Sequence, residues 1–512
     1  MSTESPTAER RNASIPSVGL GTHSARALVY FFACSSTSKV FGLLTQLALL
    51  YYLDKTDFGV VTMALTVTSF IQLIGQSGVL EVLVRRRAFR AWAIPGFWLA
   101  LTLGILSSFL IIVSAPIAAW VYGDNEQVRQ QLIWLLLVLA PSTLPFALSV
   151  VPQAQLLRKL QFQTLATINL INITLQNVLM VSFAALGLGP YSLVIPVTVG
   201  GFVATAIFWW WVRPPFAMQL RLRRWRYMVG DAGQLLGAEY GRLLIEQSDY
   251  MLLGLFYVKA IVGIYTVGFR FSIQTMQLLM TNMSNILFPT FMKLSDRPQQ
   301  QFQAFFKVQR ILAMVGVSSC FLQAATAAPF AQLLFPAKWA PSIIVMQILS
   351  LGMATRMISG ASQALLKSQG RFRTVRRLSW AYAIAQVITL SIVLLLGGGY
   401  VAVSIAVAVL ACLAGPIMFY VAIRHYNAGW AEVGAVLVRP LVCGTLSVGT
   451  AWLIAQSMAA QGYGNLSQLV VTVVVAVALN LLLARLWMRP VWDDFWIRVR
   501  RVLPQRAVAT TS

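Results

Sequence analysis

Apolar stretches long enough to cross a lipid bilayer recur along this sequence from residue 26 to residue 488. A helix needs about 20 predominantly apolar residues to span the hydrocarbon core. With 58% hydrophobic and only 11% charged residues, the 512-residue chain has the composition of a membrane protein. The stretches are continuous rather than alternating with period two, which predicts an all-α helix bundle and not a barrel of strands.

Glycine, proline and charged residues divide these stretches into about 14 predicted transmembrane helices. The predicted spans are 26–51, 59–82, 92–122, 130–152, 162–187, 190–212, 231–256, 260–292, 304–334, 340–366, 378–397, 399–423, 432–457 and 466–488. The expected fold class is therefore a polytopic all-α membrane protein.

Positive charges are distributed very unevenly about these helices. If the N-terminus is cytoplasmic, 26 of the 39 Lys and Arg residues lie in cytoplasmic tails and loops, and four more near helix ends bring that side to 30. Only Lys55, Arg129, Lys259 and Lys338 fall on the opposite side. Because cytoplasmic loops retain Lys and Arg, we expect both termini in the cytoplasm and the chain in the inner (plasma) membrane. The net charge of +24 is then a topology signal and does not indicate nucleic-acid binding.

The segments outside the predicted helices are short. The first 25 residues are polar and lack the apolar core of a signal peptide, so we expect a cytoplasmic tail. The basic segment 213–230 is either a cytoplasmic linker or an amphipathic helix on anionic lipid, with Phe216, Leu220 and Trp225 dipping into the surface. The C-terminal tail has the same two interpretations, with Trp492 and Trp496 as interfacial anchors.

Two short motifs recur at nearly the same spacing and indicate an internal repeat. The pattern Lys-x3-Gly-x2-Thr begins at Lys55, after the first predicted helix, and again at Lys259, after the seventh, 204 residues later. Arg158 and Lys367, 209 residues apart, lie in similar segments after the fourth and tenth helices. Repeats of six helices in the same orientation predict two lobes related by an axis along the membrane normal, an arrangement found in transporters.

This repeat divides the chain into six expected parts. They are an N-terminal tail (1–25), an N-lobe of helices 1–6 (26–212), a basic cytoplasmic linker (213–230), a C-lobe of helices 7–12 (231–424), helices 13–14 (425–489) and a C-terminal tail (490–512).

The seventh predicted helix carries four charges, although charge is scarce elsewhere in the spans. Glu239, Arg242, Glu246 and Asp249 are three, four and three residues apart, which places them on one stripe of a helix. Arg242 has a glutamate three residues before it and another four residues after it, so both pairs can form along the helix. Such a stripe must face a wet cavity or protein partners. It is either a functional site or a structural network of ion pairs.

Three further cations lie within predicted spans: Lys39 in the first helix, Arg270 in the eighth and Arg356 in the tenth. Together with Arg242 they would form a cationic cavity suited to an anionic substrate such as a diphosphate. Glu239, Glu246 and Asp249 are candidates for ion coupling at the same cavity. Four glutamines, Gln46, Gln72, Gln76 and Gln274, either line this cavity or bond between helices.

Several segments resemble the polysaccharide transporter family, the lipid-linked oligosaccharide flippases of the multidrug/oligosaccharidyl-lipid/polysaccharide exporter superfamily. The resemblance rests on "DYMLLGLFYVKAIVGIYTVGFR" at 249–270, on "TDFGVVTMALTV" with "GVLEVLVRR" after the first helix, and on "QLLRKLQF" at 155–162. Asp54 and Gly268 depart from the family pattern, which has Pro and Ala there. The resemblance implies two lobes, alternating access and a lipid-linked oligosaccharide as substrate. The partners to be expected are membrane lipids and, possible as well, a glycan polymerase and chain-length machinery.

Two other functions remain open from the sequence. A cation-coupled drug exporter of the same superfamily would be expected to have an acidic cavity, whereas the cavity candidates here are four basic and three acidic residues. A membrane-embedded glycosyltransferase or polymerase would need carboxylates in an outer loop, for which Asp54 and Asp57 are the best candidates. No cofactor, disulfide or metal site is expected, because the four cysteines lie in apolar runs without paired spacing and only two histidines are present.

Overall fold

The computed structural model describes residues 17–75, 78–85, 89–214 and 222–487. Over these residues the chain forms helices, turns and no strand, which confirms the predicted all-α class. Eleven helical segments of this described part are long and apolar enough to cross a membrane. The protein is therefore a multi-pass membrane protein.

The first group of helices comprises α1 to α8. Their bounds are α1 Ser17–Tyr52, α2 Lys55–Gly75, α3 Val79–Arg85, α4 Phe89–Tyr122, α5 Glu126–Leu139, α6 Thr143–Arg158, α7 Phe162–Ala185 and α8 Tyr191–Val212, with a short 3₁₀ turn, η1 Ala140–Ser142, between α5 and α6. We call α1–α8 the N-lobe.

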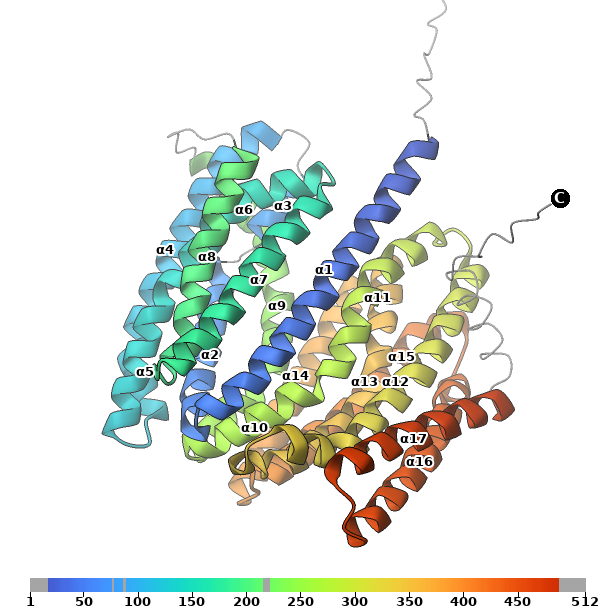
Figure 1. Cartoon of the computed structure of the whole chain (residues 1–512). Helices are drawn as coiled ribbons and strands as arrows, with labels where there is room; N and C mark the ends of the chain where they lie inside the picture. The colour runs from blue at the N-terminus through green and yellow to red at the C-terminus, as the bar shows by residue number, and fades with distance from the viewer. Residues whose placement is uncertain (1–16, 76–77, 86–88, 215–221, 488–512) are drawn as a thin grey trace, which may run out of the picture.

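The second group comprises α9 to α15, which we call the C-lobe, followed by α16 and α17. The bounds are α9 Leu222–Phe256, α10 Lys259–Ser272, α11 Gln274–Lys293, α12 Pro298–Leu334, η2 Ala337–Trp339, α13 Ser342–Ser368, α14 Phe372–Leu395, α15 Tyr400–Ile423, η3 Arg424–Tyr426, α16 Trp430–Ala460 and α17 Asn465–Trp487. Figure 1 shows the two lobes side by side, with the α16–α17 pair beside the C-lobe.

Some predicted boundaries were wrong. The helix expected at 231–256 begins at Leu222, so the second half of the expected basic linker is helical, and α1 likewise begins inside the expected N-terminal tail, at Ser17. The eighth predicted span is two helices, α10 and α11, which meet at Ile273. Phe216, Leu220, Gln76, Trp492 and Trp496 lie outside the described residues. The three expected spans that are not among the eleven apolar ones correspond to α1, α9 and the α10–α11 pair.

The two copies of the Lys-x3-Gly-x2-Thr motif meet where the lobes join, because α2 packs against α10. A Cβ atom added to Gly59 would lie 1.8 Å from the carbonyl oxygen of Lys259, and one added to Gly263 would lie 1.9 Å from that of Lys55. Only glycine permits so close an approach of two backbones. The Thr62 hydroxyl lies 3.1 Å from that of its repeat counterpart, Thr266. The contacts are therefore reciprocal, as expected for elements related by a local two-fold axis.

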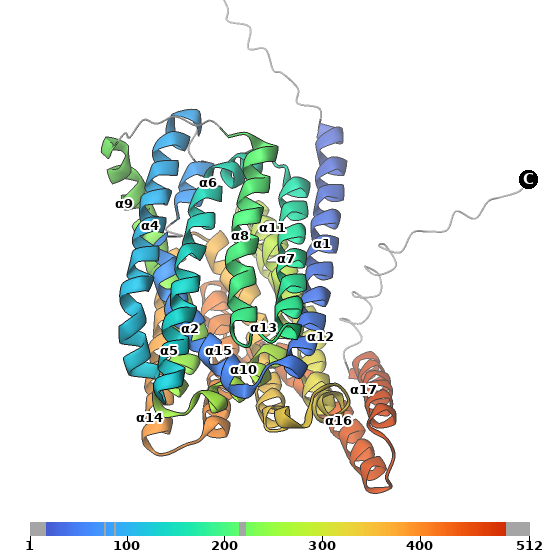
Figure 2. The same cartoon turned by 60° about the vertical axis from the view of Figure 1, so that its left-hand side comes forward.

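Charged residues from opposite lobes reinforce this junction, which we call the seam. The Lys259 ammonium lies 3.0 Å from Asp124 Oδ1, and the Lys259 backbone N–H donates to the other carboxylate oxygen at 2.7 Å. Lys338 pairs with Asp54 at 2.9 Å. In Figure 1 the seam lies at the end of the molecule opposite the start of α1, and in Figure 2 the turn between α1 and α2 lies at this same end.

Trp339 closes the seam beside these ion pairs. This residue of η2 is fully buried, and its indole N–H donates to the carbonyl of Leu50 in α1 at 2.9 Å. Its ring meets Phe58 of α2 edge to face, with 5.2 Å between the centroids. The apolar cluster around these residues draws on both lobes, and it extends from Leu50 in the N-lobe to Leu349 in the C-lobe. The core is thus continuous across the lobes at this end of the molecule.

The second sequence repeat also has matching geometry. After α6, Leu160 takes a left-handed backbone with φ 55°, and Gln161 N–H donates back to the carbonyl of Leu156 at 3.0 Å. After α13, Gly370 has φ 72°, and Arg371 N–H donates to the carbonyl of Leu366 at 2.9 Å. Both helices therefore end with the same left-handed cap, although only one of the two uses glycine for it.

Candidate functional site

A cavity of about 400 Å³ lies between the lobes and is lined by residues of both. Helix α2 of the N-lobe contributes Thr62, Leu65 and Ser69 to its wall. The C-lobe contributes most of the polar lining, which is Glu246, Gln247, Asp249, Tyr250, Thr266, Arg270, Gln277, Arg356 and Gln386. Four of the seven candidate residues predicted from the sequence, Glu246, Asp249, Arg270 and Arg356, thus share one cavity.

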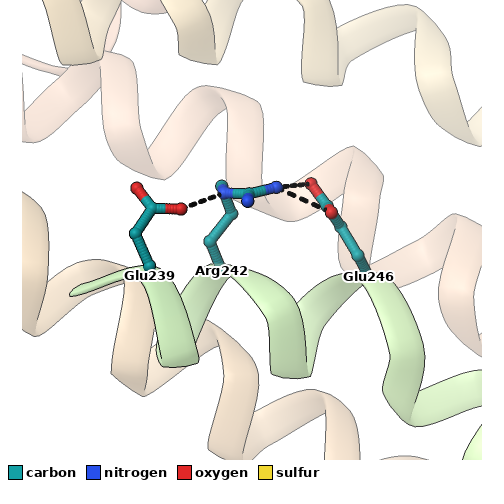
Figure 3. Close-up of polar contacts among 3 residues, drawn as sticks. All are labelled: Glu239, Arg242 and Glu246. Atoms are coloured by element: carbon teal, nitrogen blue, oxygen red, sulfur yellow. Dashed lines mark hydrogen bonds and ion pairs between the residues drawn. The ribbon is translucent and has the colours of Figure 1, made fainter. Parts of the chain in front are cut away.

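The charged stripe on α9 pairs internally, as its spacing predicts. Arg242 Nε donates to Glu239 Oε2 at 2.7 Å, and Arg242 Nη1 donates to both oxygens of Glu246 at 2.7 Å (Figure 3). All three side chains are about half exposed. Because Arg242 already meets two carboxylates, its charge is largely neutralised and it is a poorer anion ligand than the sequence suggested.

Asp249 differs from the other three charges of α9, because its side chain is buried. One carboxylate oxygen accepts a hydrogen bond from the Tyr265 hydroxyl at 2.7 Å, and the other accepts one from the Tyr250 backbone N–H at 2.9 Å. Asp249 is only 1% exposed. A buried carboxylate needs such partners to remain in place. The pattern Asp249…Tyr265 on which the family resemblance rests is therefore a direct contact between α9 and α10.

Arg270 and Arg356 are the cations of the cavity that keep their charge available. In the described part of the chain, no carboxylate lies within 4 Å of either guanidinium group. Among the residues that the structure describes, the Arg356 guanidinium makes one weak hydrogen bond, to the sulfur of Met353 at 3.9 Å. A partly buried guanidinium without a carboxylate is costly unless a ligand or water supplies the acceptors. Two such groups at one cavity wall form a suitable site for an anion with several oxygens.

Lys39 lies apart from this arrangement. Its ammonium donates to the backbone carbonyl of Gln277, at the start of α11, at 2.8 Å. It lines a separate pocket of about 280 Å³ between α1 and α7, together with Ser35, Ser38 and Asn169. Lys39 is therefore a contact between the lobes near the cavity rather than part of the cavity wall. The charged residues that line the cavity are two basic and two acidic, so the pairing of these charges, and not their sum, favours an anion.

Sequence reasoning missed several residues of the wall, among them Gln277 and Gln386. Gln386 donates from α14 to the carbonyl of Ile245 and to the hydroxyl of Ser248, both at 3.0 Å, and so fixes the position of α9. Gln277 lies one helical turn after Gln274, which the sequence analysis considered, whereas Gln386 lies on α14, which carries no predicted site residue. Of the four glutamines considered from the sequence, Gln72 bonds to Ser142 within the N-lobe and Gln46 lines a neighbouring cavity.

The two outer-loop carboxylates considered for an enzyme are both engaged. Asp54 pairs with Lys338, and Asp57 accepts a hydrogen bond from the Asp54 backbone N–H at 3.0 Å. Asp54 thereby links the two lobes, and Asp57 holds the turn before α2. These contacts give both carboxylates a role in structure.

Comparisons with known proteins agree with this architecture. Residues 49–344 match the family described as "Polysaccharide biosynthesis protein". The succinoglycan biosynthesis transport protein ExoT of Rhizobium meliloti (strain 1021) is 25% identical over 304 residues, which are 58% of this chain and 60% of that protein. The teichuronic acid biosynthesis protein TuaB of Bacillus subtilis (strain 168) is 25% identical over 315 residues, or 59% and 62% of the two chains. The matches span about three fifths of the length of these relatives.

Solved structures show that the fold is shared over most of the chain. The lipid II flippase MurJ, in an inward closed conformation, superposes with a TM-score of 0.73 and 12% identity, over 90% of this chain and 99% of that one. A multidrug resistance transporter of the MOP superfamily, in an inward-facing conformation, has a TM-score of 0.56 and 14% identity, over 79% and 95% of the two chains. At these identities the likeness concerns the fold alone.

Proposed function

Because the chain belongs to the polysaccharide biosynthesis protein family, we propose that it moves a polyprenyl-diphosphate-linked oligosaccharide from the cytoplasmic to the outer leaflet by alternating access. The observation that carries this proposal is the pair of guanidinium groups, Arg270 and Arg356, at one cavity wall, with no carboxylate partner among the described residues. They would hold the diphosphate, and the lipid tail would remain in the bilayer between helices.

The proposal includes a topology. The chain crosses the inner membrane 14 times with both termini in the cytoplasm, which the 30-to-4 distribution of Lys and Arg supports. The seam is then at the outer end of the molecule, because it includes Lys55, Lys259 and Lys338, three of the four outer cations. Transport requires this seam to open. Cysteine-accessibility labelling tests the topology, since Asp57→Cys and Gln369→Cys should react from opposite sides.

A drug exporter is the nearest alternative, because a multidrug transporter shares the fold. A cationic drug requires available carboxylates, whereas Glu246 is held by Arg242 and Asp249 is buried against Tyr265. The distribution of partners therefore favours the anionic substrate. A polymerase or transferase is less well supported, since Asp54 and Asp57 are engaged and the relatives' names describe transport and biosynthesis proteins.

A deletion strain separates these functions. Loss of a flippase should leave completed lipid-linked repeat units on the cytoplasmic leaflet. Accumulation of incomplete units would indicate a transferase instead, and drug sensitivity without any accumulation would indicate an exporter. Complementation with Arg270→Gln connects the outcome to the cavity, because this variant should accumulate the same completed units as the deletion.

A further inference from the structure

A second, smaller cavity adjoins the central one and is built mainly by the N-lobe. It measures about 210 Å³ and lies among α1, α2, α7 and α8. Leu65 and Arg270 line both cavities, so the two spaces are neighbouring compartments separated by these side chains. The polar residues that the N-lobe contributes are Thr45, Gln46 and Asn177, and the remainder of the N-lobe lining is apolar or glycine.

The two amides of this compartment carry buried atoms without partners. Gln46 Nε2 and Asn177 Nδ2 are inaccessible to solvent and have no hydrogen-bond partner in the described part of the chain. Exchanging the oxygen and nitrogen of an amide would leave one polar atom of each side chain in the same position. Buried polar groups in native proteins are nearly always satisfied by protein, water or ligand. Both amide side chains line one cavity, so a rotation of either side chain would turn its unsatisfied atom toward a hydrogen-bonding ligand there.

The chemistry of the two compartments differs. The central cavity has guanidinium groups, which suit phosphate oxygens, whereas the smaller one has neutral amides and a hydroxyl, with Arg270 only at the shared edge. Neutral amides match hydroxyl and acetamido groups. At about 210 Å³ the compartment is below the usual range of about 300–1,000 Å³ for drug-sized ligands, so it fits a single sugar ring better than an oligosaccharide.

We propose that Gln46 and Asn177 form a subsite for the sugar nearest the diphosphate of the transported lipid. This inference rests on the proposed function and deepens it, because it assigns diphosphate and sugar to different lobes. The C-lobe arginines hold the charged group that all lipid-linked precursors share. The N-lobe amides contact the sugar, which differs among these precursors, and so contribute to substrate selectivity.

The test uses the full-length protein in lipid nanodiscs and two probes. One is a polyprenyl diphosphate that carries a single N-acetylhexosamine, and the other is the same lipid diphosphate without sugar. Gln46→Leu and Asn177→Leu should each weaken binding of the sugar-bearing probe about five- to tenfold, as expected for the loss of one hydrogen bond, and should leave the sugar-free probe unchanged. Arg270→Gln should weaken both probes.

Gln72→Leu is the matched control, because Gln72 bonds to Ser142 and lines neither cavity. It should bind both probes as the wild type does. Gln46 and Asn177 lie on different helices, so if one variant fails to fold, the other variant still tests the sugar subsite. Equal losses for both probes, or no loss for either, would overturn the sugar subsite. If the wild type binds neither probe, the proposed function itself fails.

Discussion

The seam and the central cavity use charge in opposite ways, although both lie between the lobes. In the seam two cations pair with carboxylates of the other lobe, Lys259 with Asp124 and Lys338 with Asp54. At the cavity wall, Arg270 and Arg356 have no carboxylate within 4 Å among the described residues. Charges that hold a fold together are satisfied internally, whereas charges that bind a ligand must remain available. Pairing is thus a better guide to function here than the number of charges.

The largest effect on stability is expected from Lys259→Met. This lysine is 1% exposed, so the substitution leaves Asp124 without its ammonium partner at a largely buried junction. Breaking a buried ion pair costs about 3–5 kcal/mol, and the value here should fall at the lower end, because Asp124 is one quarter exposed. The thermal unfolding midpoint of the purified protein measures the loss.

Lys338→Met is the control for that variant. The Lys338–Asp54 pair belongs to the same seam, but its side chains are 31% and 78% exposed. Solvent screens such a pair, so its loss should cost no more than about 1 kcal/mol. Equal destabilisation by the two variants would show that burial does not distinguish the two ion pairs.

Arg270→Gln should differ from Lys259→Met, because it should have a large effect on transport and little effect on stability. A hydrogen bond to a charged group contributes about 1.5–3 kcal/mol, so transport by proteoliposomes should fall about 10- to 150-fold. The unfolding midpoint should stay the same or rise, because a desolvated cation without a carboxylate is removed. Arg129→Gln, at an exposed pair with Glu126, should leave transport unchanged. If the Arg270→Gln protein unfolded, Arg270 would have a structural role, like the paired charges of the seam.

Gly59→Ala tests whether the seam is a closed gate. The added Cβ would lie 1.8 Å from a backbone oxygen, which cannot rotate away, so α2 and α10 must separate. Overpacking of this kind costs about 1–3 kcal/mol, which would shift the population away from the joined state roughly 5- to 140-fold.

Spin labels at Thr56 and Ala337, both exposed at the seam end, should therefore report a longer distance in the Gly59→Ala variant. Gly449→Ala is the control: no atom lies within 4 Å of the added Cβ, so the distance between the labels should not change. An unaltered distance in the Gly59→Ala protein would mean that the helices absorb the methyl group without opening the seam.

Local spacing predicted the part of the site that lies on one helix. The intervals between Glu239, Arg242 and Glu246 determined their pairing, because residues three and four apart face one another on a helix. The repeat likewise indicated that residues near Gly59 and Gly263 are equivalent, although not that they touch.

Contacts between helices could not be predicted in this way. Asp249 belongs to the same helical stripe, yet its role depends on Tyr265, which follows a turn of the chain. Lys39 was expected in the cavity because it lies within a predicted span, but a position within a span does not specify the direction of a side chain. Side-chain partners across helices depend on packing angles that sequence periodicity does not contain.

Apart from the control variants, Arg242→Ala should have the smallest effect of the four substitutions, and it tests whether Arg242 belongs with the structural or with the ligand-binding charges. A buried Arg242 would leave two uncompensated carboxylates on removal, at a cost of several kcal/mol. Because the three side chains are about half exposed, solvent screens the pairs, and the expected cost is no more than about 1 kcal/mol, or about a fivefold loss of transport.

The loss caused by Arg242→Ala should shrink at high salt, which screens the remaining carboxylates. It should also be smaller when Glu239→Gln and Glu246→Gln are present, because no unpaired charge then remains. A loss of transport as large as that of Arg270→Gln, persisting in the triple variant, would show that Arg242 binds the substrate directly. The charged stripe of α9 would then bind ligand. In that case, the pairing of charges in the absence of substrate would no longer distinguish structural charges from ligand-binding charges.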